Sequence, residues 1–225
     1  MVSVTSQARA ALTTSRLDLE LLRVEHAEEM APLLDDPVLH TYIGGTPATL
    51  SQLRERYRRM VVGRSPDGSQ RWLNWVLRRR VDGRAVGTLQ ATLYEGTPDQ
   101  QGVIAEVAWV VAAPYQGRGY ASEAAQTMLT WLREQDVTTV VAHVHPEHAA
   151  SRGVARAIGL TETTTVVDGE TRWHRSLVQG SRSACNAARI SGWLNQPGFS
   201  PRPYRSTTAK GGHSAGGHGV SWRKQ

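Results

Sequence analysis

The sequence predicts an α/β domain built on a mixed, mostly antiparallel central sheet of about seven strands that is flanked by helices. Short β-branched runs separated by turn residues dominate the middle of the chain. Two of the turns, Asp82-Gly83 and Asp168-Gly169, are pairs typical of β-hairpins. The longest helical segment separates two apolar strands, which is the arrangement of a parallel crossover.

The first third of the chain contributes one strand and two helices. Its predicted elements are a strand over residues 17–24, a helix over 27–34, and a helix that starts at Thr49 or Ser51 and reaches Val62. The run Asp35-Asp36-Pro37 is expected to end the first helix. Residues 40–46, between the two helices, are predicted to be a loop that forms one wall of an acceptor site.

The rest of the domain alternates between strands and helices. The predicted strands are 72–79, 85–94, 103–112, 138–144, 161–167 and 171–176, and the predicted helices are 120–134 and 149–157. The first of these helices places Ala124, Met128 and Leu129 on one apolar face. The 138–144 run is apolar without clean alternation, as expected for a buried central strand.

Charge and composition divide the chain into three parts. The 225 residues carry 26 Lys+Arg and 20 Asp+Glu, a net charge of +6 and a pI near 10.0. Residues 177–225 hold seven of the basic residues and no acid, so residues 1–176 have a net charge of −1. The sequence predicts a flexible N-terminus over 1–15, a catalytic domain over 16–177 and a basic, Gly/Ser/Pro-rich, disordered tail over 178–225.

Several classes of protein are disfavoured. No apolar run approaches the length of a membrane span, and the first 16 residues lack the apolar core of a signal peptide. The single cysteine, Cys185, permits no internal disulfide. These features predict a cytoplasmic protein that has no membrane partner, and they leave both a monomer and a homodimer open.

The sharpest motif is the segment QGRGYA at residues 116–121, between a strand and the longest helix. A helix start offers unpaired backbone N–H groups and the positive end of the helix dipole, and glycines let a ligand approach them closely. The pattern therefore predicts a cradle for a pyrophosphate group. An ordinary glycine-rich turn is the structural alternative.

Two other phosphate-binding loops fit less well. A P-loop ends in Gly-Lys-Ser/Thr, which this segment does not have. A dinucleotide fingerprint needs glycine or alanine where Ser122 follows Gly117 and Gly119. A nicotinamide-dependent oxidoreductase remains one alternative function. A second alternative is a nucleic-acid-binding protein that acts, weakly, through its basic tail.

These residues resemble the GCN5-related N-acetyltransferase (GNAT) family, especially its ribosomal-protein N-terminal acetyltransferase (RimJ/RimL-like) subgroup. The matching residues are Gln116, Gly119 and Ala121 of the family's Q/R-x-x-G-x-G/A loop, residues 122–124 after it, and a second block over 145–151 and 157–160. The resemblance covers about residues 16–177. It departs from the subgroup at His148, where the subgroup usually has Asn.

The resemblance implies acetyl-CoA as co-substrate. The residues that it assigns to acetyl-CoA are Trp109, Val110, Val111, Gln116, Gly117, Arg118, Gly119, Tyr120, Ala121, Ser122 and His148. The two parallel strands would splay apart and admit the thioester, and the N–H of Val110 or Val111 would stabilise the oxyanion. The acetyl group would pass by direct attack to a primary amine of a small molecule or a protein N-terminus.

Direct transfer needs a base for the amine and an acid for the departing thiolate. Glu106, on the strand before the loop, is the predicted base, and a surface carboxylate is the alternative. Ser151 is the predicted acid, with helix capping as the alternative. His143 is the predicted relay for the proton, although His143, His145 and His148 also raise the question of a metal site. Because no carboxylate or cysteine pattern completes such a site, the sequence predicts no metal.

Overall fold

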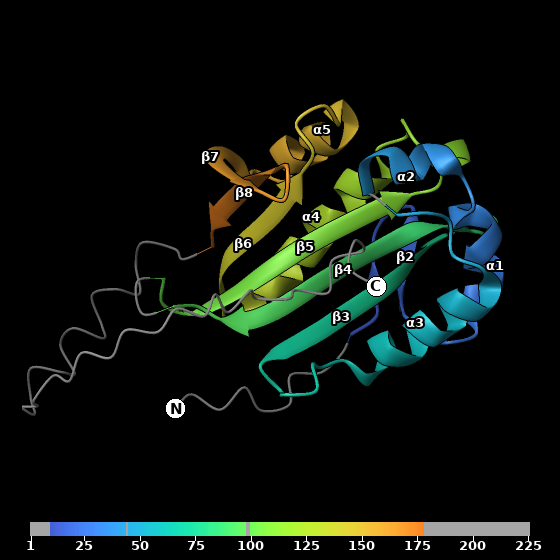
Figure 1. The fold of residues 1–225 in the computed structure, drawn as a ribbon, viewed down its shortest axis with the longest axis horizontal. Coiled ribbons are helices and arrows are strands. Elements are labelled where there is room, and N and C mark those ends of the chain that lie inside the picture. The colour runs from blue at the N-terminus through green and yellow to red at the C-terminus, as the bar shows by residue number, and fades with distance from the viewer. Residues whose placement is uncertain (1–9, 44, 98–99, 178–225) are drawn as a thin grey trace, which may run out of the picture. The chain divides into compact units, whose positions relative to one another are not determined.

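The computed structural model describes residues 10–43, 45–97 and 100–177. In this part of the chain, one eight-stranded sheet has the order β1-β2-β3-β4-β5-β6-β8-β7 (Figure 1). Neighbouring strands are antiparallel except β5 and β6, which are parallel. The predicted fold class is therefore confirmed: a mixed, mostly antiparallel sheet with one parallel pair, flanked by helices.

The elements follow the predicted order closely from residue 70 onward. The strands are β1 Leu12–Thr13, β2 Leu17–Leu21, β3 Gln70–Arg79, β4 Ala85–Glu95, β5 Val103–Val111, β6 Val137–Val144, β7 Thr161–Val167 and β8 Glu170–Ser176. The helices are α1 His26–Leu34, α2 Pro37–Ile43, α3 Leu50–Val62, α4 Tyr120–Glu134 and α5 Ala149–Ala157, with a 3₁₀-helix η1 at Ala113–Tyr115. None of the helices in the described ranges has the length and apolar character needed to cross a bilayer.

The predictions for the first third of the chain were partly wrong. Residues 40–43 were predicted as loop, yet they belong to α2. The Asp-Asp-Pro run ends α1 and also starts α2, because Asp36 caps the new helix by accepting the N–H of Val38 (2.9 Å). The strand predicted over 17–24 ends at Leu21.

The sheet begins earlier than the predicted domain start at Arg16. Leu12 and Thr13 of β1 pair with Leu19 and Asp18 of β2, in the stretch that was predicted to be flexible. Residues 1–9 and the tail predicted to be disordered, 178–225, lie outside the described residues.

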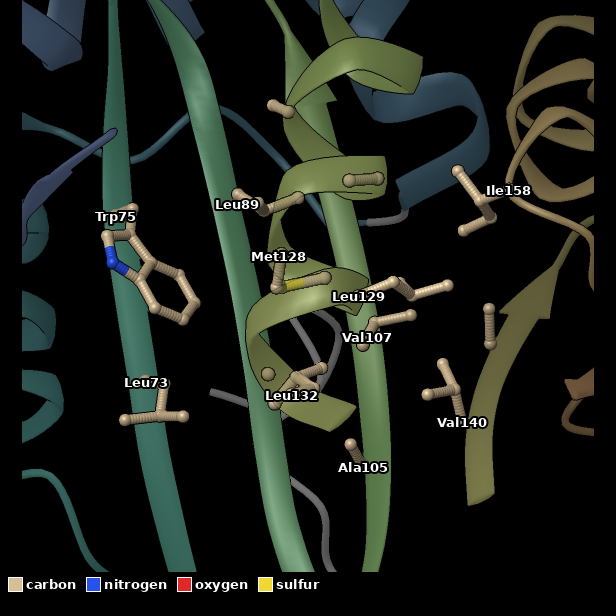
Figure 2. Close-up of a cluster of buried hydrophobic side chains, with 14 of the residues drawn as sticks. Leu73, Trp75, Leu89, Ala105, Val107, Met128, Leu129, Leu132, Val140 and Ile158 are labelled. Atoms are coloured by element: carbon tan, nitrogen blue, oxygen red, sulfur yellow. The ribbon is translucent and has the colours of Figure 1, made fainter. Parts of the chain in front are cut away.

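One face of the sheet is covered by α4, which lies behind β5 in the view of Figure 1. Its inward residues are all at most 2% exposed: Ala124, Ala125, Met128, Leu129 and Leu132. They pack against Trp75, Leu89 and Val107 of the three central strands (Figure 2). Because burial of apolar surface stabilises the folded state by about 25 cal/mol per Å², this layer contributes to the stability of the domain.

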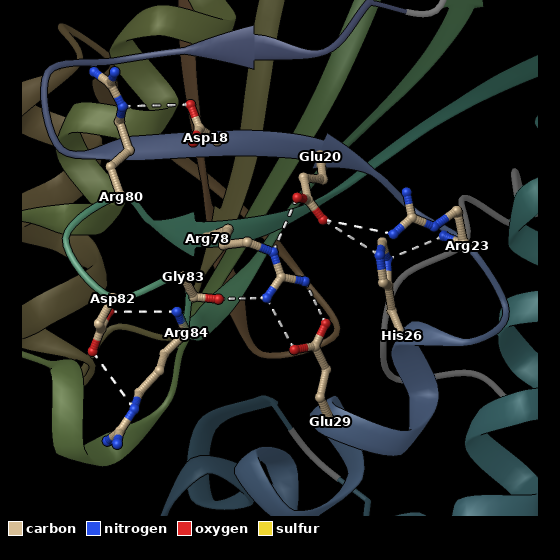
Figure 3. Close-up of polar contacts among 10 residues, drawn as sticks. All are labelled: Asp18, Glu20, Arg23, His26, Glu29, Arg78, Arg80, Asp82, Gly83 and Arg84. Atoms are coloured by element: carbon tan, nitrogen blue, oxygen red, sulfur yellow. Dashed lines mark hydrogen bonds and ion pairs between the residues drawn. The ribbon is translucent and has the colours of Figure 1, made fainter.

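The opposite face carries α1 and α3 around a second cluster that includes Met30, Tyr57 and Val76. An ion-pair network ties α1 to the sheet (Figure 3). The guanidinium of Arg78 donates to both carboxylate oxygens of Glu29 (2.5 and 3.1 Å) and contacts Glu20 on β2 (3.0 Å). These hydrogen bonds from Arg78 hold the pKa of Glu29 below its ordinary value.

Candidate active site

The parallel strands β5 and β6 are paired over only part of their length. Pairing ends at Glu106 with Val141, whereas β5 continues to Val111 alongside β4 and β6 continues to Val144 alongside β8. Beyond Glu106 the two strands therefore part and leave a gap between their facing edges. The resemblance to the GNAT family implied this splay.

The backbone of β5 alternates between β4 and the gap. The N–H of Ala112 donates to the carbonyl of Val86 on β4 (2.9 Å), and Val110 is paired with Thr88 in the same register. Successive residues of a strand direct their backbone N–H and C=O groups to opposite sides. The backbone groups of Val110 therefore also point to β4, whereas those of Trp109 and Val111 point to the gap. Of the two alternatives for the oxyanion donor, Val110 and Val111, only Val111 therefore has a backbone amide directed at the gap.

The glycine-rich loop leads from η1 into α4 with two residues in the left-handed region. Gly117 has φ 73° and Gly119 has φ 77°, conformations that L-residues adopt at a cost. Gly119 is the N-cap of α4 and brings no side-chain acceptor to the first turn, so the turn's N–H groups can serve an external anion.

Gln116 has a different part in the loop from the one predicted. Its backbone N–H donates to the carbonyl of Ala113 (3.2 Å), so this amide is already used inside η1. Its side-chain Nε2 donates to the carbonyl of Val111 (2.9 Å) on the gap side of β5. Gln116 therefore fixes the loop to the end of the strand, and the free amides begin at Gly117.

A pocket of about 360 Å³ lies beside this loop. The predicted residues that line it are Trp109, Val110, Val111, Gln116, Gly117, Gly119, Tyr120, Ala121, Ser122, His148 and Ser151. Arg118, also predicted to bind the cofactor, does not line it and instead lies against the ring of Tyr115 (6.0 Å). The wall predicted over residues 40–46 is present through Tyr42, but it belongs to α2, and sequence reasoning missed Val38 and Leu39 because the helix itself was not predicted.

The first turn of α4 is braced by the hairpin between β1 and β2. One oxygen of Glu123 accepts from the hydroxyl of Thr14 (2.5 Å) and from the backbone N–H of Arg16 (3.0 Å), and the other accepts from the Arg16 guanidinium (2.6 Å). Arg16 also donates to the carbonyl of Arg118 (3.0 Å) in the loop. Burial alone would raise the pKa of Glu123, but the hydrogen bonds from Thr14 and Arg16 outweigh it and hold the pKa below its ordinary value.

Glu106 and His143 meet where the strands part. The Nδ1 of His143 lies 3.2 Å from Oε1 of Glu106, and both side chains are about three-quarters buried. The structure thus brings together two of the three predicted catalytic residues. A carboxylate–imidazole pair at this position can accept and hold a proton.

Ser151 and His148 lie on the other side of the gap, at the start of α5. His148 is the N-cap residue, and no side chain caps this helix, so Ser151 does not have the capping role considered for it. The ring of His148 stacks on that of Tyr42 (4.2 Å, 20°), which joins α5 to α2 over the pocket. Burial, and then the neighbouring His145, lower the pKa of His148.

The histidines do not gather into a metal site in the described residues. No group of three His, Cys, Asp or Glu side chains there is arranged to hold a metal ion. His143 is engaged with Glu106, and the Nδ1 of His145 accepts the N–H of Glu147 (3.2 Å).

Comparison with known proteins agrees with this geometry. The family model for the acetyltransferase (GNAT) domain matches residues 16–161. Over 56 residues, the chain is 39% identical to an uncharacterized N-acetyltransferase, YnaD, from Bacillus subtilis; the match spans 24% of this chain and only about a third (33%) of that relative.

Solved structures share the fold at low sequence identity. RimL, a ribosomal L7/L12 α-N-protein acetyltransferase solved in complex with coenzyme A, has a TM-score of 0.60 and 15% identity over 74% of this chain and 98% of its own. A GNAT-family acetyltransferase from Bacillus anthracis has a TM-score of 0.58 and 18% identity, over 75% and 99% of the two chains.

These matches support acetyl transfer and give no support to the oxidoreductase or nucleic-acid alternatives. The family model covers well over half of the 225 residues, including the splayed strands, the glycine-rich loop and the start of α5. The chain therefore belongs to the GNAT family of acetyltransferases.

Proposed function

We propose that this protein transfers an acetyl group from acetyl-CoA to a primary amine of a small molecule or of a protein N-terminus. The observation that carries the proposal is the gap between β5 and β6, which opens beside a helix N-terminus with free amides and into a pocket of about 360 Å³. A pyrophosphate suits the helix end, and an extended amide-bearing arm suits the edge of a parted strand.

The residues of the pocket fit the chemistry of acetyl-CoA. The amides of Gly117, Gly119 and the first turn of α4 would hold the pyrophosphate, and a Cβ at Gly117 would meet nothing within 4 Å, so the loop is open to a ligand. The amides of Trp109 and Val111, which face the gap, would serve the pantetheine arm and the oxyanion of the tetrahedral intermediate. RimL was solved with coenzyme A bound, which is consistent with this assignment.

The transfer balances as a direct displacement. The neutral amine attacks the thioester carbonyl, a C–N bond forms, the C–S bond breaks, and coenzyme A leaves as a thiol. Glu106 takes the proton that the amine loses, and His143, in contact with it, relays that proton. Ser151, in the first turn of α5 beside the pocket, gives its hydroxyl proton to the departing sulfur and regains a proton from solvent.

Two measurements test this function. The melting temperature should rise with acetyl-CoA and stay unchanged with NAD(P)H, because a ligand that binds the folded state alone stabilises it and the proposed co-substrate is acetyl-CoA. Release of free thiol should depend on both acetyl-CoA and an amine, measured over an amine panel. Cys185→Ser removes the chain's only thiol and with it the background signal. Stabilisation by NAD(P)H without stabilisation by acetyl-CoA would contradict the proposal.

A role of the tail in nucleic-acid binding can be tested separately. Its sign would be salt-dependent binding that disappears when residues 178–225 are deleted. We propose that acetyl transfer does not need the tail, so kcat/KM for acetyl-CoA should be the same with and without it.

A further inference from the structure

Arg172 lies in a row with the proposed catalytic pair. β8 runs antiparallel to β6 with Arg172 directly opposite His143, and opposite residues of an antiparallel pair project from the same face of the sheet. His143 in turn contacts Glu106 from the next strand. The three side chains thus cross β8, β6 and β5 at the level where β5 and β6 part.

The guanidinium of Arg172 is half-buried and unpaired. Within residues 10–43, 45–97 and 100–177 it makes no hydrogen bond or ion pair. Other arginines nearby are engaged: Arg175 donates to the carbonyl of Ile158 (2.7 Å), and Arg152 pairs with Glu162 (3.1 Å). A guanidinium presents five donors in a planar fork, so a half-buried one without a partner is suited to receive an anion.

The position of Arg172 is fixed, and its charge reaches across the sheet. Its backbone carbonyl accepts the hydroxyl of Thr163 on β7 (2.7 Å), which holds β8 in place at this residue. Burial and the Glu106 carboxylate raise the pKa of Tyr94 on β4, whereas Arg172 acts in the opposite direction. The positive charge is therefore felt on the Glu106 side of β6, over the face where the amine would arrive.

On the basis of the acetyl-transfer function proposed above, we propose that the acceptor is an amino acid, with a carboxylate next to the reacting amine. The amine meets Glu106 and His143, and the carboxylate meets the guanidinium of Arg172. A carboxylate brought up to Glu106 alone would be repelled, and Arg172 removes that repulsion. A protein N-terminus has a neutral amide at the same place and would leave Arg172 without a partner.

Amino acids and their amides make the test, because the two differ only in this charge. Thiol release should be compared for each L-amino acid and its L-amino acid amide, with kcat/KM corrected for the fraction of neutral amine. For the pair that reacts fastest, we expect kcat/KM for the amino acid to exceed kcat/KM for its amide about tenfold or more. This is the effect of one charged hydrogen-bonded contact. Equal rates, or a preference for the amides, would overturn the inference and favour a protein N-terminus.

Variants of Arg172 separate recognition from folding. Arg172→Gln should raise KM for the amino acid about tenfold or more and leave the amide unaffected, so that the preference disappears. Arg172→Lys keeps the positive charge but lacks the planar guanidinium, so it should retain part of the preference for the amino acid. The matched control is Arg133→Gln, on the exposed end of α4, which should change neither substrate. Equal losses for acid and amide in Arg172→Gln would mean a structural role and overturn the inference.

Failure of this inference is distinguishable from failure of the proposed function. If acetyl-CoA is hydrolysed or transferred to other amines while neither amino acids nor amides react, only the acceptor assignment is wrong. If acetyl-CoA neither stabilises the protein nor releases thiol with any amine, the proposed function fails and the acceptor assignment fails with it.

Discussion

Oε1 of Glu106 lies 3.2 Å from Nδ1 of His143, across the last paired residues of β5 and β6. An ionised carboxylate only accepts hydrogen bonds, so in the tautomer that carries its hydrogen on Nδ1 the ring donates to Glu106 and leaves Nε2 as an acceptor. The pair can therefore hold one extra proton, as a base for an attacking amine must. Under the proposed function, its place where β5 and β6 part would put it beside the incoming amine.

Replacing Glu106 by Gln should lower kcat by about 10²–10³-fold, because the amide cannot take up a proton. KM for acetyl-CoA should stay the same, since the pyrophosphate loop is untouched. The acidic limb of the pH profile should flatten in the variant. Steady-state kinetics from pH 5 to 9 measure all three quantities. Glu95→Gln, at the exposed end of β4, is the control, and a profile identical to the wild type in Glu106→Gln would make Glu106 merely structural.

Gly119→Ala should weaken acetyl-CoA binding through the backbone. The φ of Gly119 is 77°, which costs an Ala about 1–2 kcal/mol, although the new Cβ would find room 3.6 Å from Arg16. The matched control is Gly83→Ala, in the hairpin between β3 and β4, where φ is 68° and the space is open. Both variants should lose similar stability in urea, and only Gly119→Ala should raise KM for acetyl-CoA several-fold. A rise of KM of the same size in Gly83→Ala would contradict a role of the glycine-rich loop in binding acetyl-CoA.

Glu123→Gln should loosen the loop from a distance. Glu123 accepts from Thr14 and Arg16, and Arg16 also holds the carbonyl of Arg118. Loss of the carboxylate charge should lower the free energy of unfolding by about 1–2 kcal/mol and raise KM for acetyl-CoA severalfold, with kcat little changed. The control is Glu28→Gln, which breaks the exposed pair with Arg54 (2.8 Å). It should lower the free energy of unfolding by at most about 0.5 kcal/mol. An unchanged KM in Glu123→Gln would show that the brace does not position the loop.

Most of the fold could be predicted from the sequence because apolar residues recur with a clear periodicity in its long helices and strands. The helix at 120–134 and the hairpin at Asp168-Gly169 appear where the pattern puts them. α2 was missed because seven residues show too little periodicity and because a proline after acidic residues can both end and begin a helix. Such short elements are decided by capping and by tertiary contacts.

The site was less predictable because its contacts join residues far apart in the chain. Arg16 meets Glu123 107 residues later, and no local pattern marks the pair. The direction of the amides of Val110 and Val111 depends on the register of β5 with β4, which a single sequence does not reveal. Arg172 lies opposite His143 only through the pairing of β8 with β6.

His26 gives the domain a pH dependence that is separate from catalysis. Its side chain is 3% exposed, and its Nδ1 accepts the N–H of Arg23 (3.2 Å) near Glu20 (Figure 3). Burial, and then the charge of Arg23, lower the pKa of His26 from its ordinary value of 6.5. The unfolded chain then binds a proton more readily than the folded one, so stability is complete above about pH 6.5 and falls as the pH drops below it.

His26→Asn should reduce this loss. Asn keeps an acceptor for the N–H of Arg23 and does not titrate. Between pH 7.5 and 5.5, the free energy of unfolding should therefore fall less in the variant than in the wild type, by on the order of 1 kcal/mol. Urea unfolding at both values measures the difference, and staying above pH 5 keeps Glu29 ionised, since its pKa lies below 4.5. His148, whose pKa is also lowered, contributes in the same window, so His148→Asn is compared in parallel. If His26→Asn loses as much stability as the wild type, the buried imidazole is not the source of the acid sensitivity.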